Sequence, residues 1–358
     1  MMSLFRTIIA CSMIAFATGA RAEFDLDKLM RDTSDNFVRP AYAAFADSTK
    51  QLVAAQSELC ENPAEDQLKN ARSAYSVVLD AWSRVEIFRV GPVIQENRLE
   101  RILFYPDRKG TGLKQVQAAL SEKDEATTNP TALAAKSVAM QGLGALEFIN
   151  FGTGSETLLT PDGAFRCRYG LAVAQNLLEI SRQLADAWTA GGEVDSHWNS
   201  HGETNPFARN DREALNLVLG TIIHGLEQIQ DIRIGAFLDI KEAKDKPKSA
   251  IYWRSGLTIR SITENLQSLQ SLFDVSGLDG ALPDDQAYVA DSIRFDFKAA
   301  LEALKTLDRP VEELLADAKA REKLVFVRNT IGDLIRRFDQ EFAVASGLAA
   351  GFSFADGD

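Results

Sequence analysis

The order of apolar and polar residues along the chain is that of amphipathic helices. Apolar residues recur at steps of three and four, which places them on one face of an α-helix. No convincing series of alternating strand segments is present, so the sequence predicts an all-α protein. From Leu68, one such face carries Ala71, Tyr75, Val78, Trp82 and Val85. Helical segments are expected at about residues 25–60, 63–91, 130–151, 165–190, 211–240, 249–273, 283–307 and 310–345.

The N-terminus has the features of a secretory signal peptide. A basic head precedes an apolar stretch over residues 8–16, and the small-x-small site Ala20-Arg21-Ala22 follows. This stretch is shorter than the roughly 20 residues that span a bilayer. We therefore predict a signal peptide at residues 1–22 and a mature protein of the periplasm or cell envelope with no transmembrane segment. A lipid anchor at Cys11 is the less favoured alternative, because almost no apolar core precedes that cysteine.

The remaining chain is long enough for two hydrophobic cores. A stretch rich in Gly, Ser, His and Asn at residues 191–207 separates the helical segments of the first half from those of the second. The sequence therefore predicts two helical-bundle domains joined by a linker. The N-terminal bundle is expected at residues 23–190, the linker at 191–210 and the C-terminal bundle at 211–358.

Net charge and cysteine content limit the possible partners of the protein and the compartment in which it folds. Without the leader the chain has 37 basic and 51 acidic residues, a net charge of −14. Nucleic acid is excluded as a partner, because phosphate backbones demand clustered Lys and Arg. The two remaining cysteines, Cys60 and Cys167, are expected to form a disulfide in an oxidising compartment. The alternative is a pair of buried free thiols.

Two glycines near an acidic residue mark a candidate site in the first half. Gly142 and Gly144 stand in a helix-like stretch, where a glycine costs roughly 1 kcal/mol relative to alanine. Such glycines are tolerated where another backbone or a ligand approaches closely. Glu147 lies beside this gap and is therefore a candidate site residue. The alternative is a helix–helix contact with Glu147 at its rim.

Tryptophan and arginine occur together in both halves, a combination that suits a polar pocket or an interdomain contact. We predict a ligand-binding cleft between the two bundles, in which the carboxylates hold a cation or the arginines an acidic group. For the tryptophans, packing in the core is the alternative. The expected lining residues are Glu147, Glu86, Arg89, Trp82, Trp253 and Arg254.

Histidines offer a weaker set of metal ligands. His224 and Glu227 have the i, i+3 spacing of one helix face, and helical bundles bind metals through such inward pairs. The candidate metal set is Glu147, His224 and Glu227, with a solvated polar stripe as the alternative. His197 and His201 lie in the expected linker, where their geometry is not fixed, and the chain has no His-Glu-x-x-His motif.

Several segments, in order along nearly the whole mature chain, resemble the imelysin-like family. These are bacterial envelope proteins, nominally grouped with metallopeptidases and often linked to iron uptake, and the periplasmic or lipoprotein branch is the most similar. The matching segments are Trp82 through Gly91-Pro92, Phe104-Tyr105-Pro106-Asp107, Gly142 through Gly152, Cys167-Arg168-Tyr169, Tyr252-Trp253-Arg254-Ser255-Gly256 and the tail Gly351 through Asp358.

The resemblance implies two helical bundles with a site at their interface and a motif written Gly-x-His-x-x-Glu. Gly142 and Glu147 occupy its first and last places, but Gly144 stands where histidine belongs. This departure removes one expected metal ligand and argues against peptidase activity. The sequence thus predicts a non-catalytic ligand-binding protein associated with iron uptake. Its ligand would be a small molecule or a metal ion, iron or zinc, and its partners other iron-uptake envelope proteins. The alternatives are a metal-dependent peptidase and a structural or interaction protein of the envelope.

Overall fold

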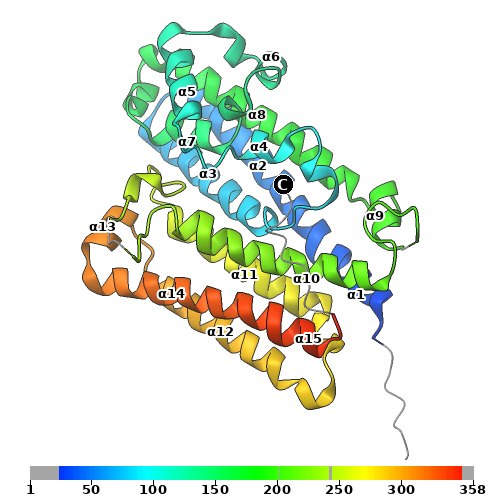
Figure 1. The fold of residues 1–358 in the computed structure, drawn as a ribbon. Coiled ribbons are helices and arrows are strands. Elements are labelled where there is room, and N and C mark those ends of the chain that lie inside the picture. The colour runs from blue at the N-terminus through cyan, green and yellow to red at the C-terminus, as the bar shows by residue number, and fades with distance from the viewer. Residues whose placement is uncertain (1–23, 201, 242–243, 349–358) are drawn as a thin grey trace, which may run out of the picture.

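The computed structural model describes residues 24–200, 202–241 and 244–348, and the described residues contain helices and no strand. The all-α prediction is therefore confirmed. Two groups of long helices, called layers here, lie one above the other (Figure 1). The first layer contains α2 (Arg39–Glu61), α3 (Glu65–Val85) and α8 (Ala164–Ala187). The second contains α10 (Asp211–Glu227), α11 (Thr258–Ser276), α12 (Tyr288–Lys305) and α14 (Ala318–Arg336). In this lower layer, α10 and α11 lie above α14 and α12 (Figure 1).

Short helices surround the two layers. Those of the first half, α4 to α7, gather at one end of the molecule, and α9 lies at the other end (Figure 1). No described helix is both long and apolar enough to cross a membrane. The short helices are α1 (Leu26–Thr33), α4 (Arg98–Ile102), α5 (Thr111–Glu122), α6 (Pro130–Ala134), α7 (Leu143–Phe151), α9 (Glu193–Trp198), α13 (Val311–Ala316) and α15 (Ala343–Ala345).

The first helix crosses from one layer to the other. Helix α1 packs against α10 and α11 of the second layer and continues through a π-helical turn, Ser34–Val38, into α2 of the first. The helix continues through Pro40, which stands at the start of α2 directly after the π-helical turn. The irregularity of this helix lies in the π turn just before Pro40, since a proline removes one backbone hydrogen bond from a continuing helix.

The apolar core extends through both layers. Buried side chains from both halves form one contiguous cluster, in which Trp82 packs against Phe45 with ring centroids 5.2 Å apart. A smaller cluster surrounds Cys167 and includes Leu59 and Leu158. The domain boundaries at residues 190 and 211 stay a prediction. The predicted signal peptide, residues 1–22, lies outside the described residues.

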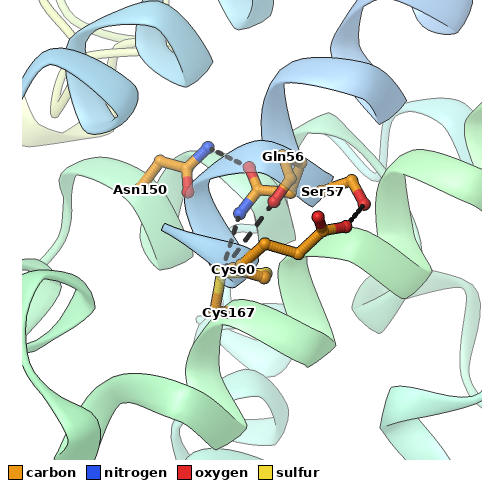
Figure 2. Close-up of a disulfide and its surroundings, with 6 residues drawn as sticks. Gln56, Ser57, Cys60, Asn150 and Cys167 are labelled. Atoms are coloured by element: carbon orange, nitrogen blue, oxygen red, sulfur yellow. Dashed lines mark hydrogen bonds between the residues drawn. A yellow bond between two sulfur atoms is a disulfide. The ribbon is translucent and has the colours of Figure 1, made fainter. Parts of the chain in front are cut away.

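The predicted disulfide is present and joins the end of α2 to the beginning of α8. Cys60 and Cys167 are bonded and lie 107 residues apart in sequence. Figure 2 shows Gln56 beside this bridge: its amide nitrogen lies 3.9 Å from the sulfur of Cys167, and its amide oxygen accepts a hydrogen bond of 3.2 Å from Asn150. The bridge therefore sits in a buried, hydrogen-bonded corner that connects α2, α7 and α8.

Helices α3 and α11 join the two layers through polar contacts. The hydroxyl groups of Ser83 and Ser261 lie 2.9 Å apart and are buried. Nearby, the guanidinium of Arg260 donates to the carboxylate of Asp80 with a nitrogen–oxygen distance of 2.7 Å. Such buried hydrogen bonds fix the position of α3 relative to α11 more narrowly than apolar contacts would, because an unpaired buried polar group costs about 1–3 kcal/mol.

Among the described residues, the most deeply buried ion pair also joins the two halves. Glu86, at the end of α3, accepts a hydrogen bond of 2.6 Å from Arg233, and both side chains are 2% exposed. The other oxygen of Glu86 accepts a bond of 2.8 Å from Asn265 on α11. The Arg233 guanidinium also lies 5.0 Å from the ring centroid of Tyr105. The carboxylate of Glu86 therefore binds two segments of the second half to the end of α3.

Removal of the disulfide is expected to lower the free energy of unfolding substantially. A bridge that closes a loop of 107 residues restricts the unfolded chain, an effect of about 4–5 kcal/mol in the chain-entropy account. The Cys60→Ser, Cys167→Ser double variant should therefore unfold at a lower urea concentration than the oxidised wild type. Reduced wild type should match the variant, and equal midpoints for all three proteins would contradict the prediction.

Loss of Arg233 is expected to destabilise the protein strongly. The Arg233→Ala variant leaves the Glu86 carboxylate buried without its cation, which costs about 3–5 kcal/mol. The matched control is Arg209→Ala, which removes the exposed partner of Glu213 on α10 and should barely change the urea midpoint. Equal midpoints for the two variants would show that the buried pair does not stabilise the junction.

Candidate functional site

A pocket of about 770 Å³ opens where the two halves of the chain meet. The first half contributes residues between 103 and 116 and between 138 and 148. The second half contributes residues between 231 and 236 and between 246 and 254. Its size lies within the range of pockets that take small ligands, roughly 300–1,000 Å³.

Three of the expected lining residues reach this pocket. Glu147 comes from α7, and Trp253 and Arg254 come from a turn of the second half. Although these residues lie more than one hundred positions apart in sequence, the fold brings them to the same cavity. They are the part of the candidate site that the structure brings together.

The other three expected lining residues are not among the described residues that line the pocket. Trp82 packs in the core, and Glu86 is occupied by Arg233. The Arg89 side chain donates a long hydrogen bond, 3.4 Å, to the backbone carbonyl of Glu86. Burial lowers the pKa of the Arg89 guanidinium, and Glu86 opposes this effect. Of the three, Trp82 belongs to the core and Glu86 to the junction between the halves, whereas Arg89 is exposed.

The two glycines of α7 have different roles. A side chain at Gly142 would place its Cβ 2.2 Å from the carbonyl oxygen of Ile102, so only glycine permits this close approach of two backbones. Gly142 is also the N-cap of α7. A Cβ at Gly144, in contrast, would meet nothing within 4 Å, and Gly144 lines the pocket. Glycine at position 144 therefore leaves open space in the cavity.

Glu147 holds a turn of the opposite half. Its side chain is 4% exposed, and one carboxylate oxygen lies 2.9 Å from both the backbone nitrogen and the hydroxyl of Ser255, which donate to it. Burial raises the pKa of the Glu147 carboxyl, and the hydrogen bonds from Ser255 and the charge of Arg254 oppose that rise. The acidic residue of the motif is therefore a buried anchor between the halves.

The turn that Glu147 holds presents Trp253 and Arg254 to the pocket. Its backbone enters the left-handed region at Tyr252, with φ of 55°, which is uncommon for a residue other than glycine. The Arg254 guanidinium lies 4.4 Å from the ring centroid of Trp253 and 5.5 Å from that of Phe148. Burial lowers the pKa of Arg254, and the nearby Glu147 opposes this effect. Arg254 is thus fixed between two aromatic rings.

The described residues of the expected metal set do not lie together in a way that fits a metal ion. His224 and Glu227 lie on α10, where their side chains are 44% and 48% exposed and their ring nitrogen and carboxylate oxygen are 2.9 Å apart. Neither lines the pocket that contains Glu147. In the part of the chain that the structure describes, no three His, Cys, Asp or Glu side chains form a group that could hold a metal. The expected metal set of Glu147, His224 and Glu227 is therefore not assembled. His201 falls outside the described residues.

Sequence reasoning missed several functional positions. Ser255 stands in a segment that the sequence singles out, but its pairing with Glu147 spans 108 residues and leaves no local pattern. Arg233 is missed for the same reason. Arg108, Lys246 and Lys248, which also line the pocket, could have been noticed as basic residues in an acidic chain.

Comparisons with known proteins agree with this fold. An imelysin-like protein from Psychrobacter arcticum 273-4 superposes with a TM-score of 0.75 at 18% identity, over 92% of this chain and 99% of that one. A protein named as an iron-regulated protein A precursor, from Parabacteroides distasonis ATCC 8503, gives a TM-score of 0.73 at 14% identity, over 92% and 97%. At these identities the likeness concerns the fold alone.

No curated protein matches the sequence. The family comparison is more specific, because it concerns sequence rather than fold. The model described as imelysin matches residues 38–336, which is most of the chain. This protein therefore belongs to the imelysin family.

Proposed function

We propose that this protein is a non-catalytic ligand-binding protein of the periplasm that acts in iron uptake, and that its ligand occupies the pocket between the two halves. The observation that carries the proposal is the pocket itself, about 770 Å³ and lined by both halves. Aromatic and charged side chains converge on it from α7 and from the turn that Glu147 anchors. Concave sites with a few fixed polar groups are the usual form of small-molecule sites.

The residues at the positions of the Gly-x-His-x-x-Glu motif support a role without catalysis. A metal-dependent peptidase requires several protein ligands and a metal-bound water. Gly144 offers no ligand, and the Glu147 oxygen nearest the turn accepts two hydrogen bonds from Ser255. A general base has to reach the proton that it removes, whereas this carboxylate is buried and engaged.

Other features support the proposed periplasmic location and the proposed link to iron uptake. The leader predicted at residues 1–22 would export the chain, and the Cys60–Cys167 bridge suits an oxidising compartment. The link to iron rests on the family and on the similar fold of a protein named as iron-regulated. Envelope proteins of the same uptake system are the proposed partners.

Filling the space at Gly144 is expected to abolish ligand binding. A Cβ there meets nothing within 4 Å, so the side chain of a Gly144→Trp variant would extend into the pocket without displacing the fold. Native mass spectrometry of protein purified from its own envelope should show a non-covalent small-molecule adduct on the wild type and none on the variant. Elemental analysis of the same samples would report whether iron accompanies the adduct.

The matched control is Gly144→Ala. Alanine should keep the adduct and raise the free energy of unfolding by about 0.5–1 kcal/mol, because glycine is the poorer helix former. An adduct that survives in Gly144→Trp would place the ligand elsewhere. Chelator-sensitive proteolysis by the wild type that is lost in Glu147→Ala would overturn the non-catalytic role and favour a peptidase.

Stability should also depend on pH through Glu147. Burial raises the pKa of this carboxyl above its ordinary value of 4.5, so the folded state holds the proton more tightly than the unfolded chain does. The wild type should therefore gain stability relative to a Glu147→Gln variant as the pH falls from neutral toward 4.5. Urea unfolding of both proteins over this range measures the difference.

Glu213 on α10 provides a control, because stability should change with pH in the opposite direction there. Arg209 holds the pKa of the Glu213 carboxyl below its ordinary value, so the wild type should lose stability relative to Glu213→Gln as the pH falls. A difference between wild type and Glu147→Gln that stays constant with pH would mean that the Glu147 carboxyl does not titrate differently in the folded protein.

A further inference from the structure

The pocket is cationic in a protein that is otherwise strongly acidic. The whole chain has a net charge of −12, yet four basic side chains line this one cavity. Such a local reversal attracts ions of the opposite sign to the protein's own, because clefts focus the field of the charges that line them. The four residues are Arg108, Lys246, Lys248 and Arg254.

The acidic residues of the same lining are already occupied. The carboxylate of Asp107 accepts hydrogen bonds of 2.7 and 2.8 Å from the backbone nitrogens of Thr111 and Gly112, at the beginning of α5. Glu147 is bound to Ser255. Asp231 lies 3.4 Å from a guanidinium nitrogen of Arg328. These contacts hold the three carboxylates in place, and with four basic side chains against three acidic ones the lining keeps a net positive charge while the chain as a whole is acidic.

The basic side chains, in contrast, keep their donors available. Within the described part of the chain, the Arg254 guanidinium stacks on Trp253 and Phe148 but donates no hydrogen bond. The planar guanidinium carries a fork of N–H donors that matches a carboxylate, and contact with the two rings restricts its movement. Lys248 places its ammonium 5.6 Å from the ring centroid of Trp253.

The spacing of these cations limits the shape of the ligand. The Arg254 and Lys248 charges lie 4.4 and 5.6 Å from the centroid of the same ring, so they can be no more than about 10 Å apart. Two acidic groups separated by a few carbon atoms would reach both. Apolar lining residues such as Phe104 and Val116 suit the carbon skeleton between those groups.

We propose that the ligand of this pocket is a small organic acid with two or more carboxylates, one of them bound by Arg254 and another by Lys248 with Lys246. This inference rests on the proposed ligand-binding function and specifies its chemical class. A charge-assisted, bidentate bond from a pre-positioned guanidinium gives both affinity and orientation. The apolar wall distinguishes an organic acid from a bare inorganic anion.

Tryptophan fluorescence can test the charge of the pocket. Trp82, Trp188 and Trp198 are at most 1% exposed, so Trp253 is the tryptophan that solutes can reach. In the full mature protein at constant ionic strength, iodide should quench this fluorescence severalfold more than caesium does, after the quenching by each ion is divided by its quenching of free N-acetyltryptophanamide. A Trp253→Phe variant should lose the quenchable signal. Equal quenching by the two ions, or stronger quenching by caesium, would overturn the proposal.

Competition then tests the ligand class. Citrate and succinate should protect Trp253 from iodide at concentrations at least tenfold lower than acetate, phosphate or glycerol require. The Arg254→Gln variant should need at least tenfold more citrate for the same protection, whereas Arg212→Gln, which removes an exposed positive charge on α10 outside the pocket, should match the wild type. Unchanged urea midpoints would show that both variants are folded.

The outcomes distinguish a failure of this proposal from a failure of the proposed ligand-binding function on which it rests. Protection by phosphate or glycerol as strong as that by citrate would overturn the organic-acid class, as would an undiminished effect in Arg254→Gln. If Gly144→Trp still removes the adduct in that case, the pocket binds a ligand of another kind and only the present inference fails. If Gly144→Trp keeps the adduct, the proposed function fails by itself.

Discussion

The carboxylate of Glu147 is buried away from water, which costs free energy. The arrangement of the pocket depends on the hydrogen bonds that offset this cost. An ionised carboxylate in an apolar surrounding is strongly disfavoured unless donors satisfy its oxygens. Here the donors are the backbone and hydroxyl of Ser255, which belong to the other half of the chain. Because the carboxylate needs these donors, the turn has to stay where it is, and Trp253 and Arg254 keep their places in the lining.

Helix faces were predictable because burial itself creates their pattern. Tyr75 and Val78, both on the face that begins at Leu68, are completely buried in α3. The segment at residues 130–151 was less well predicted. It forms α6, a short 3-10 turn and α7 rather than one helix, because Gly142 takes an extended conformation against the backbone of Ile102. Nothing in the local sequence reveals that neighbour.

The candidate site was predictable only in part, for a related reason. Periodicity shows that Trp82, Glu86 and Arg89 belong to one region of a helix, but not which segment covers it. Glu86 is covered by Arg233, 147 residues away, and so belongs to the junction instead of the pocket. The open space at Gly144 is equally hidden from the local sequence, since it depends on which distant segments surround the residue.

Helix α1 has a mechanical consequence for access to the pocket. This helix packs against α10 and α11 and continues through the π turn into α2, so the start of the described chain ties the two layers together from the side opposite the short helices α4 to α7 (Figure 1). A hinge motion that parts the layers would have to detach α1 as well as separate Glu86 from Arg233. If a ligand binds in the pocket as proposed, we expect it to enter by rearrangement of Lys246 and Lys248, which are exposed and line the pocket, while the two layers move as one body.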